Sequence, residues 1–371
     1  MKIVCNRDEL STALISICRI IPSRTNLPIL NGCLITAENQ TLSLRSTDLE
    51  LTLEINIPVQ VEEEGSTVVL AKYFSDLVRR MSGEQVSLSY SEENKMLEVK
   101  CESAISQLHT WMAAEYPEKQ ENPEGQQINF QGGKWKRYTN KVLAAAAQQD
   151  VRMNYAGVYV TFENEKIQMA ATDAYRLAFI RIANNSDVVD SDLFIPGRAL
   201  IEVNRLASDS DNLEIFWDSG TICIEAQDFV LTSRLINSQF PNYENIIPSE
   251  PELEIEVPRD ILLNTLERAS LFISTNEHFA IACLKVDEDK LIVSAQAVDV
   301  GSLEEIITLS KPALKQAEAN FNAKYLLEPL QVMEQEKVTL CLNGPSGPAV
   351  YVEADEDEYY LHLVSPVCRA N

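Results

Sequence analysis

The chain has 371 residues, of which 45% are hydrophobic and 23% are charged, as in ordinary globular proteins, and its eight cysteines lack paired spacing, which indicates reduced thiols. Its formal net charge is −25, from 31 Lys and Arg against 56 Asp and Glu, which taken alone disfavours a protein that holds nucleic acid on a basic face. No apolar run reaches the length of a membrane span and the N-terminal residues form no signal-peptide core, so we expect a cytoplasmic protein that does not bind membranes.

The first third of the sequence alternates helices and strands. Apolar residues between Leu10 and Ile17 recur at helical spacing, so the sequence predicts an amphipathic helix that ends before Pro22. A second helix is predicted at 71–81. Strands are expected at 27–37, 41–46, 49–57, 86–90, 96–101 and 105–111. This order is typical of an α+β domain with mostly antiparallel sheet.

The same order recurs with a period of about 125 residues. Residues 156–164 align with 31–39 without a gap, and a weaker third copy covers 282–289. Identical pairs include Gly32 and Gly157, Thr47 and Thr172, and Asp48 and Asp173. The helix predicted at 71 recurs at 197 and at 323. This repetition predicts three domains of one fold, at 1–122, 123–250 and 251–371.

Domains of this size can enclose a hole of predictable width. A 120-residue domain has a radius of gyration of roughly 13–14 Å and is therefore about 35 Å across. Three such spheres in a circle leave a hole of only about 5 Å, whereas six leave about 35 Å, enough for a duplex of roughly 20 Å. Two chains that pair head to tail, domain 1 with domain 3, would supply six domains in a closed twofold ring.

Basic residues gather on several predicted helices, although the chain as a whole is acidic. The helix expected at 134–150 is basic, and so are those at 71–81 and 197–207. The residues concerned are Lys134, Lys136, Arg137, Lys141, Lys72, Arg79, Arg80, Arg198 and Arg205. The pattern is compatible with basic helices that face a hole and acidic strands that face solvent. Ordinary solvated helix faces are the alternative.

The usual signatures of enzyme chemistry are missing from the sequence. Residues 344–347 lack the Lys-Ser/Thr of a nucleotide loop and are expected to form a hairpin turn. The three histidines have no metal-ligand spacing, so we expect neither a metal nor a cofactor. Asp173 and Arg176 could form a catalytic pair, but a turn carboxylate with a local ion pair is the simpler interpretation. The acidic run 353–358 could bind a cation, but a solvated hairpin is favoured.

Several motifs occur together along the chain. They are Ala171-Thr172-Asp173-Ala174-Tyr175-Arg176-Leu177-Ala178, Ser233-Arg234-Leu235-Ile236-Asn237, Phe240-Pro241-Asn242-Tyr243, Ile247-Pro248, Ser23-Arg24, Leu27-Pro28-Ile29-Leu30 and Gln149-Asp150-Val151-Arg152. Together they resemble the bacterial DNA polymerase III β subunit family, the sliding clamps, and the resemblance extends over the whole chain. It implies an α+β chain of three tandem clamp domains, with helices on one side of mostly antiparallel sheets, that forms a six-domain ring as a head-to-tail homodimer.

The resemblance also implies a function. A sliding clamp is a processivity factor of DNA replication, not an enzyme, and it encircles duplex DNA without sequence-specific contacts. The implied partners are the replicative DNA polymerase subunit, the clamp loader, repair polymerases and mismatch-repair proteins, all bound through short linear motifs. Because a topological link requires no tight contact, an acidic protein can hold DNA if its inner wall is not repulsive.

Candidate site residues follow from the resemblance and from the charge pattern. The resemblance places Arg24, Gln149 and Arg152 nearest the duplex, and the positions of the basic helices add Lys72, Arg79, Lys136, Lys141 and Arg198. It further implies an apolar cleft between domains 2 and 3 for peptides that carry a Gln and two hydrophobic anchors. The implied cleft residues are Tyr155, Thr172, Ala174, Tyr175, Arg176, Leu177, Pro241, Ile246, Leu363, Pro366 and Val367. Burial of two anchors at about 1.5–3 kcal/mol each, less the cost of ordering the peptide, gives weak to micromolar binding.

The chain departs from the family pattern near this cleft. Many relatives have Gly-His in place of Ala174-Tyr175 and an apolar residue in place of Ser365, and the tail contains an additional Cys368. These differences bear on which peptides the cleft prefers. We expect the dimer contact to join Phe272 and Ile273, at the apolar end of a helix, with the strand that contains Ile105 and Leu108. Two other functions stay open: an enzyme built from three repeated domains, and a monomeric interaction scaffold.

Overall fold

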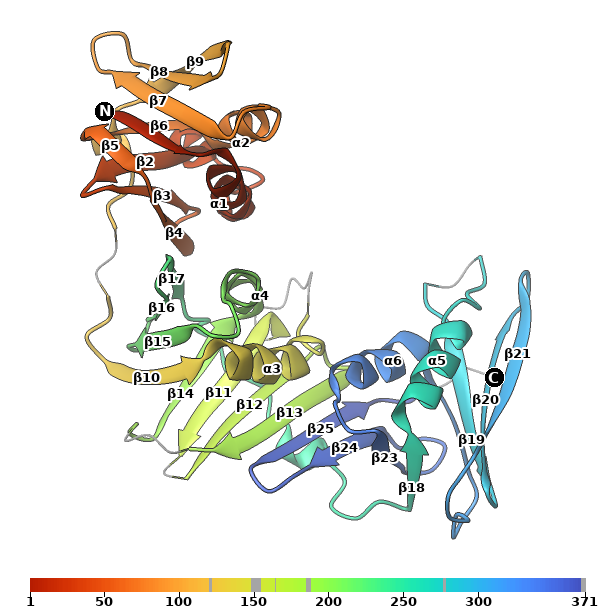
Figure 1. The fold of residues 1–371 in the computed structure, drawn as a ribbon. Helices are drawn as coiled ribbons and strands as arrows, with labels where there is room; N and C mark the ends of the chain where they lie inside the picture. The colour runs from red at the N-terminus through yellow and green to blue at the C-terminus, as the bar shows by residue number, and fades with distance from the viewer. Residues whose placement is uncertain (120–121, 148–154, 164, 185–187, 276–277, 368–371) are drawn as a thin grey trace. The chain divides into compact units, whose positions relative to one another are not determined.

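The computed structural model describes residues 1–119, 122–147, 155–163, 165–184, 188–275 and 278–367, and Figure 1 shows its ribbon. Its contacts divide the chain into two compact units. Unit 1 contains Met1–Gly133 and Ile201–Leu235, and unit 2 contains Lys134–Leu200 and Ile236–Asn371. The middle third of the sequence therefore contributes strands to both units, and the domain boundaries near 122 and 250 stay predictions.

The described part of unit 1 contains a sheet of 13 strands. Their spatial order is β10 (Gln126–Gln131), β15 (Asn212–Trp217), β16 (Thr221–Glu225), β17 (Phe229–Arg234), β4 (Leu51–Pro58), β3 (Thr41–Thr47), β2 (Gly32–Glu38), β6 (Gly65–Leu70), β9 (Ala104–Trp111), β8 (Met96–Cys101), β7 (Gln85–Ser91), β1 (Lys2–Asn6) and β5 (Gln60–Glu63). The strands from the first and middle thirds join where β17 pairs with β4, with Phe229 opposite Ile55. Strands such as β4 alternate buried and half-exposed residues, as expected for a sheet with one face on a core.

Two helices, α1 (Arg7–Ile20) and α2 (Ala71–Arg79), pack against each other in unit 1, and α1 also contacts β3 and β4. The side chain of Asn6 caps α1 by accepting hydrogen bonds from the N–H groups of Asp8 and Glu9. Leu10, Leu14 and Ile17 are fully buried on the face turned to the sheet. The predicted amphipathic stripe is therefore the face that forms the core.

Unit 2 contains, among its described residues, an eight-stranded and a four-stranded sheet. The first has the order β14 (Ser191–Pro196), β11 (Gly157–Glu163), β12 (Lys166–Thr172), β13 (Arg176–Ala183), β25 (Glu358–Val364), β24 (Ala349–Ala354), β23 (Lys337–Leu342) and β18 (Leu253–Pro258). The second has the order β21 (Gly301–Thr308), β20 (Lys290–Ala297), β19 (Ile281–Asp287) and β22 (Ala317–Asn322). Here the middle and last thirds join where β13 pairs with β25.

The remaining helices repeat the order seen in the first third. Helices α3 (Gly132–Leu143) and α4 (Gly197–Leu206) come from the middle third, and α5 (Arg259–Ala269) and α6 (Ala323–Val332) from the last. Helices α5 and α6 pack against each other, and α5 lies on β20 and β21 (Figure 1). Short 3-10 turns are η1 (Pro28–Asn31), η2 (Ala113–Glu115) and η4 (Glu244–Ile246). All strand pairs recorded for the described residues are antiparallel, which confirms the predicted α+β class with mostly antiparallel sheet.

The sequence repeat is visible in local geometry. A Cβ atom at Gly157 would lie 2.2 Å from the carbonyl oxygen of Ile195 on β14, and one at Gly32 would lie 2.5 Å from Val68 on β6. Both glycines therefore let two strands approach closely at equivalent places. Leu49 and Ala174, which follow the repeated Thr-Asp pair, both have a φ of 76°. The identical residue pairs thus mark positions where the fold requires a particular backbone.

Two predicted boundaries are wrong. The strand expected at 27–37 begins only at Gly32, because η1 occupies the residues before it. The helix expected at 134–150 ends at Leu143, where Ala145 and Ala146 turn back onto α3 through short-range hydrogen bonds. The N–H of Ala147 then donates to the carbonyl of Tyr155 at 2.9 Å.

Candidate functional site

The turn between β12 and β13 is set by its own side chains. The Asp173 carboxylate accepts hydrogen bonds from the N–H groups of Tyr175 and Arg176, at 2.9 and 3.1 Å, and the Thr172 hydroxyl accepts one from Ala174 at 3.1 Å. Ala174 adopts the left-handed region that this tight turn requires. As a result, the Tyr175 side chain is 61% exposed at the tip of the turn.

The segment after β25 lies against this turn. The N–H of Ser365 donates to the carbonyl of Tyr175 at 2.9 Å, and the N–H of Val367 donates to the carbonyl of Asn320 on β22 at 2.7 Å. Pro366, between them, is half-buried, as is Val367. Residues from two distant parts of the sequence, Tyr175 and the segment 365–367, are therefore adjacent, as the predicted cleft requires.

Leu177 and Leu363 are directly opposite each other on β13 and β25, and both are buried. They belong to an apolar cluster that includes Phe179, Phe240 and Leu361 and is covered by further residues of the segment around Ile247. In this structure the neighbouring side chains leave the two leucines at most 3% exposed, and their role in a peptide cleft stays a prediction. They form the core beneath the turn, and Thr172 is likewise buried.

Three other predicted cleft residues have different surroundings. Ile246 is exposed on η4, and it is its neighbour Ile247 that packs on the apolar cluster. Tyr155 is half-buried, and its carbonyl accepts the hydrogen bond from Ala147 that closes the end of α3. Pro241 is half-buried and lines a separate pocket.

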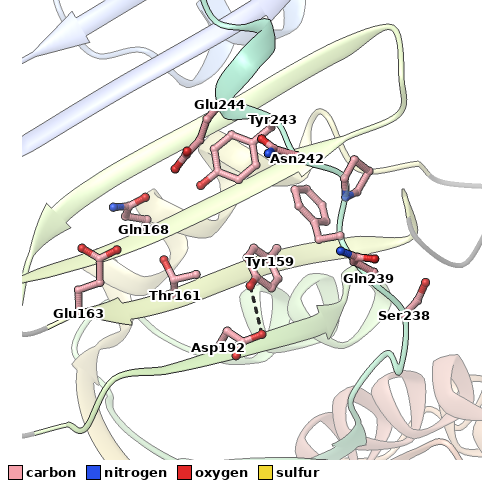
Figure 2. Close-up of a pocket in the computed structure, with 12 residues that line it drawn as sticks. Tyr159, Thr161, Glu163, Gln168, Asp192, Ser238, Gln239, Asn242, Tyr243 and Glu244 are labelled. Carbon is pink, nitrogen blue, oxygen red and sulfur yellow. Dashed lines mark hydrogen bonds between the residues drawn. The ribbon is translucent and has the colours of Figure 1, made fainter.

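This pocket of about 380 Å³ lies between β11, β12, β14 and the segment 238–244 (Figure 2). Tyr159 stacks on Phe240 with ring centroids 5.1 Å apart, and its hydroxyl donates to Asp192 at 3.1 Å. Burial, with the charge of Glu244, raises the pKa of Tyr243 to about 12. Most of the lining is polar, so the pocket is not the predicted apolar cleft. Sequence reasoning missed it, although alternating polar residues on β11 could have indicated a solvent-facing strand surface.

Arg176 is buried and ion-paired, and its predicted place in the peptide cleft stays a prediction. It is 7% exposed, and its guanidinium contacts the carboxylates of Asp173, at 3.0 Å, and of Glu328 on α6. The guanidinium carbon also lies 4.2 Å from the centre of the Tyr325 ring, a favourable cation–π geometry. Its donor groups therefore bind one carboxylate of the turn, Asp173, and one of α6, Glu328.

The candidate DNA-facing residues differ in accessibility. Arg24, Lys72 and Arg198 are exposed. Arg79 is exposed but forms an ion pair with Asp76 at 2.7 Å, and Lys136 is half-buried. Gln149 and Arg152 lie outside the described residues.

Lys141 corrects the prediction for α3. Its side chain is 2% exposed, and its ammonium group lies 2.5 Å from the carboxylates of both Glu353 and Glu358. The hydroxyl of Tyr360 donates to the Lys141 carbonyl at 3.1 Å. Lys141 therefore belongs to the packing of α3 on β24 and β25, where it cannot reach a phosphate.

The residues predicted for the dimer contact lie in different units. On β9 of unit 1, Ile105 is 59% exposed and Leu108 is half-buried. In unit 2, Phe272 and Ile273 follow α5 in a turn and are not part of the helix. Phe272 lies beside Gly301, the first residue of β21. The chain thus places these residues on or next to two strands, β9 and β21.

None of the helices in the described residues is long and apolar enough to cross a membrane. The sequence matches the family described as DNA polymerase III beta subunit in three successive segments. They are the N-terminal domain at residues 1–120, the central domain at 129–242 and the C-terminal domain at 244–367.

Relatives and solved structures agree with this match. The beta sliding clamp of Escherichia coli K12 is 28% identical, over 99% of this chain and 100% of the relative, and that of Synechococcus elongatus is 28% identical over 94% and 95%. The sliding clamp from Bacillus subtilis superposes with a TM-score of 0.91 at 23% identity, and one from Pseudomonas aeruginosa bound to griselimycin with 0.90 at 24%, both over 100% of each chain. The chain, built of three tandem clamp domains, therefore belongs to the DNA polymerase III beta subunit family, the sliding clamps of DNA replication.

Proposed function

We propose that two copies of the chain close head to tail into a ring of six clamp domains that encircles duplex DNA. In this role the chain is a non-catalytic processivity factor that slides on DNA in the cytoplasm. The surface formed by Tyr175 and the segment 365–367 would hold short linear motifs of the replicative DNA polymerase subunit, the clamp loader, repair polymerases and mismatch-repair proteins. The domain boundaries near 122 and 250 are part of this proposal.

A repeated strand junction carries the proposal. Strands β4, β13 and β21 begin at residues 51, 176 and 301, so they occupy equivalent positions 125 residues apart. The first accepts β17 and the second accepts β25, both antiparallel. The third, β21, pairs only with β20 among the described residues. The strand that corresponds to β17 and β25 in the first third is β9, which supports a third junction between β21 and the β9 of a second copy.

The edges of these two strands fit such a junction. Residues 104–109 of β9 pair with β8 on one side, and in the described part of the chain their other side is unpaired, because β6 reaches only Thr110 and Trp111. An unpaired strand edge with apolar side chains favours pairing with another chain. Ile105 is 59% exposed on one edge strand and Ile306 is 56% exposed on the other. Counted from the first residue of each strand, the β4–β17 and β13–β25 junctions differ in register by two residues. A β21–β9 junction with the first register would place Ile105 opposite Glu304, and one with the second register would place it opposite Ile306.

The charge distribution supports topological holding of DNA. At a net charge of −25, tight electrostatic binding to DNA is unfavourable, and a closed ring does not require it. The exposed basic residues Arg24, Lys72 and Arg198 can supply weak, exchangeable phosphate contacts. Arg79 and Lys136 are proposed with them, as are Gln149 and Arg152 on the basis of the resemblance.

The oligomeric state tests this proposal. We expect a species of twice the 41.6 kDa chain mass at micromolar concentration, and a single chain after the edge substitution Ile105→Asp, which buries a charge in the junction. Leu314→Asp is the matched control, because Leu314 is an exposed apolar residue outside the proposed edges. A stable single chain without any substitution would instead favour the monomeric scaffold. Equal dissociation by both substitutions would contradict the β9–β21 contact.

A further inference from the structure

The ion pairs of Arg176 connect the exposed turn to helix α6. Arg176 forms one ion pair with Asp173, which belongs to the turn. Its other two partners, Glu328 and Tyr325, both lie on α6. Glu328 also lies 3.6 Å from Lys324, one helical turn earlier. With Arg176 buried and Glu328 largely so, loss of this contact would leave each charge with only its second partner, Asp173 or Lys324, in a partly desolvated site.

A closed circuit of contacts surrounds the Tyr175 surface. The first contact is the ion pair that joins α6 to Arg176 in the turn. The second is the hydrogen bond that the N–H of Ser365 donates to the Tyr175 carbonyl. From there it continues along the chain to Val367, which donates to Asn320 on β22. Strand β22 leads directly into α6, whose first turn is capped by Asn322. Both walls of the surface, the turn and the segment 365–367, are therefore held relative to the same helix.

We propose that Arg176 and Glu328 are positioning residues that hold the Tyr175 turn against the segment 365–367, so that a bound peptide meets a preformed surface. This inference rests on the proposed peptide-binding function and deepens it. In this proposal the two residues act through the position of the turn and the segment 365–367, and not through a contact with the peptide. They hold the turn and the segment 365–367 in place before the peptide binds. Binding then does not have to include the entropic cost of ordering these two segments, which would otherwise reduce the affinity for the peptide.

The equivalent position in the preceding repeat provides a matched control. Glu202 on α4 lies 126 residues before Glu328, is also buried, and also binds two arginines, Arg19 at 2.9 Å and Arg205 at 2.6 Å. It belongs to unit 1, whereas the Tyr175 surface belongs to unit 2. Substitution of Glu202 therefore removes a comparable buried charge without touching the circuit.

The experiment compares peptide affinity for the full chain and three variants. The probe is a synthetic peptide with one Gln and two hydrophobic anchors, and binding is measured by calorimetry. We expect Glu328→Gln to weaken binding about ten-fold, as for loss of a charged hydrogen bond, and Glu202→Gln to leave the affinity unchanged. Arg176→Lys retains the charge but not the fork of donors, so we expect partial retention of affinity.

Hydrogen exchange of individual amides distinguishes a local loosening of the segment 365–367 from a general loss of stability. In Glu328→Gln, the amides of Ser365 and Val367 should exchange faster, while the amides of β24 and β25 keep their protection. Equal affinity of Glu328→Gln and the unaltered chain, or equal weakening by Glu202→Gln, would overturn the positioning role. If the unaltered chain itself does not bind the peptide, the proposed peptide-binding function fails, and that result is distinct from failure of the positioning role.

Discussion

The substitution Lys141→Met tests whether the buried ion pairs of α3 are structural. The ammonium group of Lys141 contacts Glu353 and Glu358, and Arg137 also binds Glu358. Met keeps most of the aliphatic stem but removes the charge. Two buried carboxylates then lose a cation, although Glu353 still accepts hydrogen bonds from the N–H groups of residues 334 and 335, at 2.8 and 2.9 Å.

The remaining contacts of the two carboxylates set the expected loss in the free energy of unfolding. Removal of one partner from a buried ion pair costs about 3–5 kcal/mol. Because Arg137 and the two backbone N–H groups remain, we expect the lower end, about 3 kcal/mol in the free energy of unfolding. Urea unfolding followed by circular dichroism measures the loss, and hydrogen exchange should locate it in β24 and β25. A change below about 0.5 kcal/mol, the usual size for surface substitutions, would refute a buried structural role.

Two further variants make the test specific. Replacing Glu353 and Glu358 by Gln together with Lys141→Met should recover part of the stability, because no unpaired buried carboxylate remains and Arg137 keeps Glu334 at 3.6 Å. Lys141→Met should also leave the salt dependence of DNA binding unchanged. Lys72→Met, at an exposed site, should instead lower the salt slope by about one while changing stability little. A lowered salt slope in Lys141→Met would restore the original prediction of a DNA-facing lysine.

The same cluster should respond to acid. Burial acts to raise the pKa of Glu353, but hydrogen bonds from Lys141 and from the backbone hold this pKa below its usual value. The stabilisation is therefore present above the ordinary carboxyl pKa of 4.5 and is lost as pH falls below it.

Three other predictions concern unit 2. Burial, and then the charge of Arg176, lowers the pKa of His362 to about 3, so stability should fall as pH drops below about 6.5, by about 2 kcal/mol at pH 5. His362→Phe should flatten this dependence in urea unfolding, and an unchanged pH dependence would contradict the buried neutral imidazole. Ala174→Gly should raise the free energy of unfolding by about 1 kcal/mol, because glycine adopts a φ of 76° without strain; a loss of stability would count against the turn geometry. Tyr175→Ala and Val367→Asp should each weaken peptide binding at least about ten-fold while the dimer mass stays unchanged; unaltered affinity would remove these residues from the binding surface.

Local signals in the sequence predicted much of the fold. Helix periodicity located α1, and the repeated spacing located α2, α4 and α6, each of which begins at the residue expected. The repeated Thr-Asp pair marked equivalent tight turns, because its hydrogen bonds are formed within five residues. Features fixed by short-range hydrogen bonds and side-chain spacing are visible in a single sequence.

The errors have a common physical cause. The charge pattern predicts that Lys141 faces DNA, but the two carboxylates that bind it, those of Glu353 and Glu358, are 212 and 217 residues away along the chain. The burial of Leu177 also depends on a distant segment, because Leu363 on the neighbouring strand β25 is almost as far away in sequence. Helical spacing tells which face of a helix is apolar, but not whether a distant segment brings countercharges to a lysine. Burial by residues remote in sequence therefore has to come from the structure.

The central claim is that the chain holds DNA by enclosing it. The most direct measurement is the retention of loaded protein on circular DNA, followed by cleavage of the circle at one site. If the ring encloses DNA, the protein should stay on the closed circle through gel filtration at moderate salt and should leave after the cut. Equal loss from circular and linear DNA would contradict enclosure.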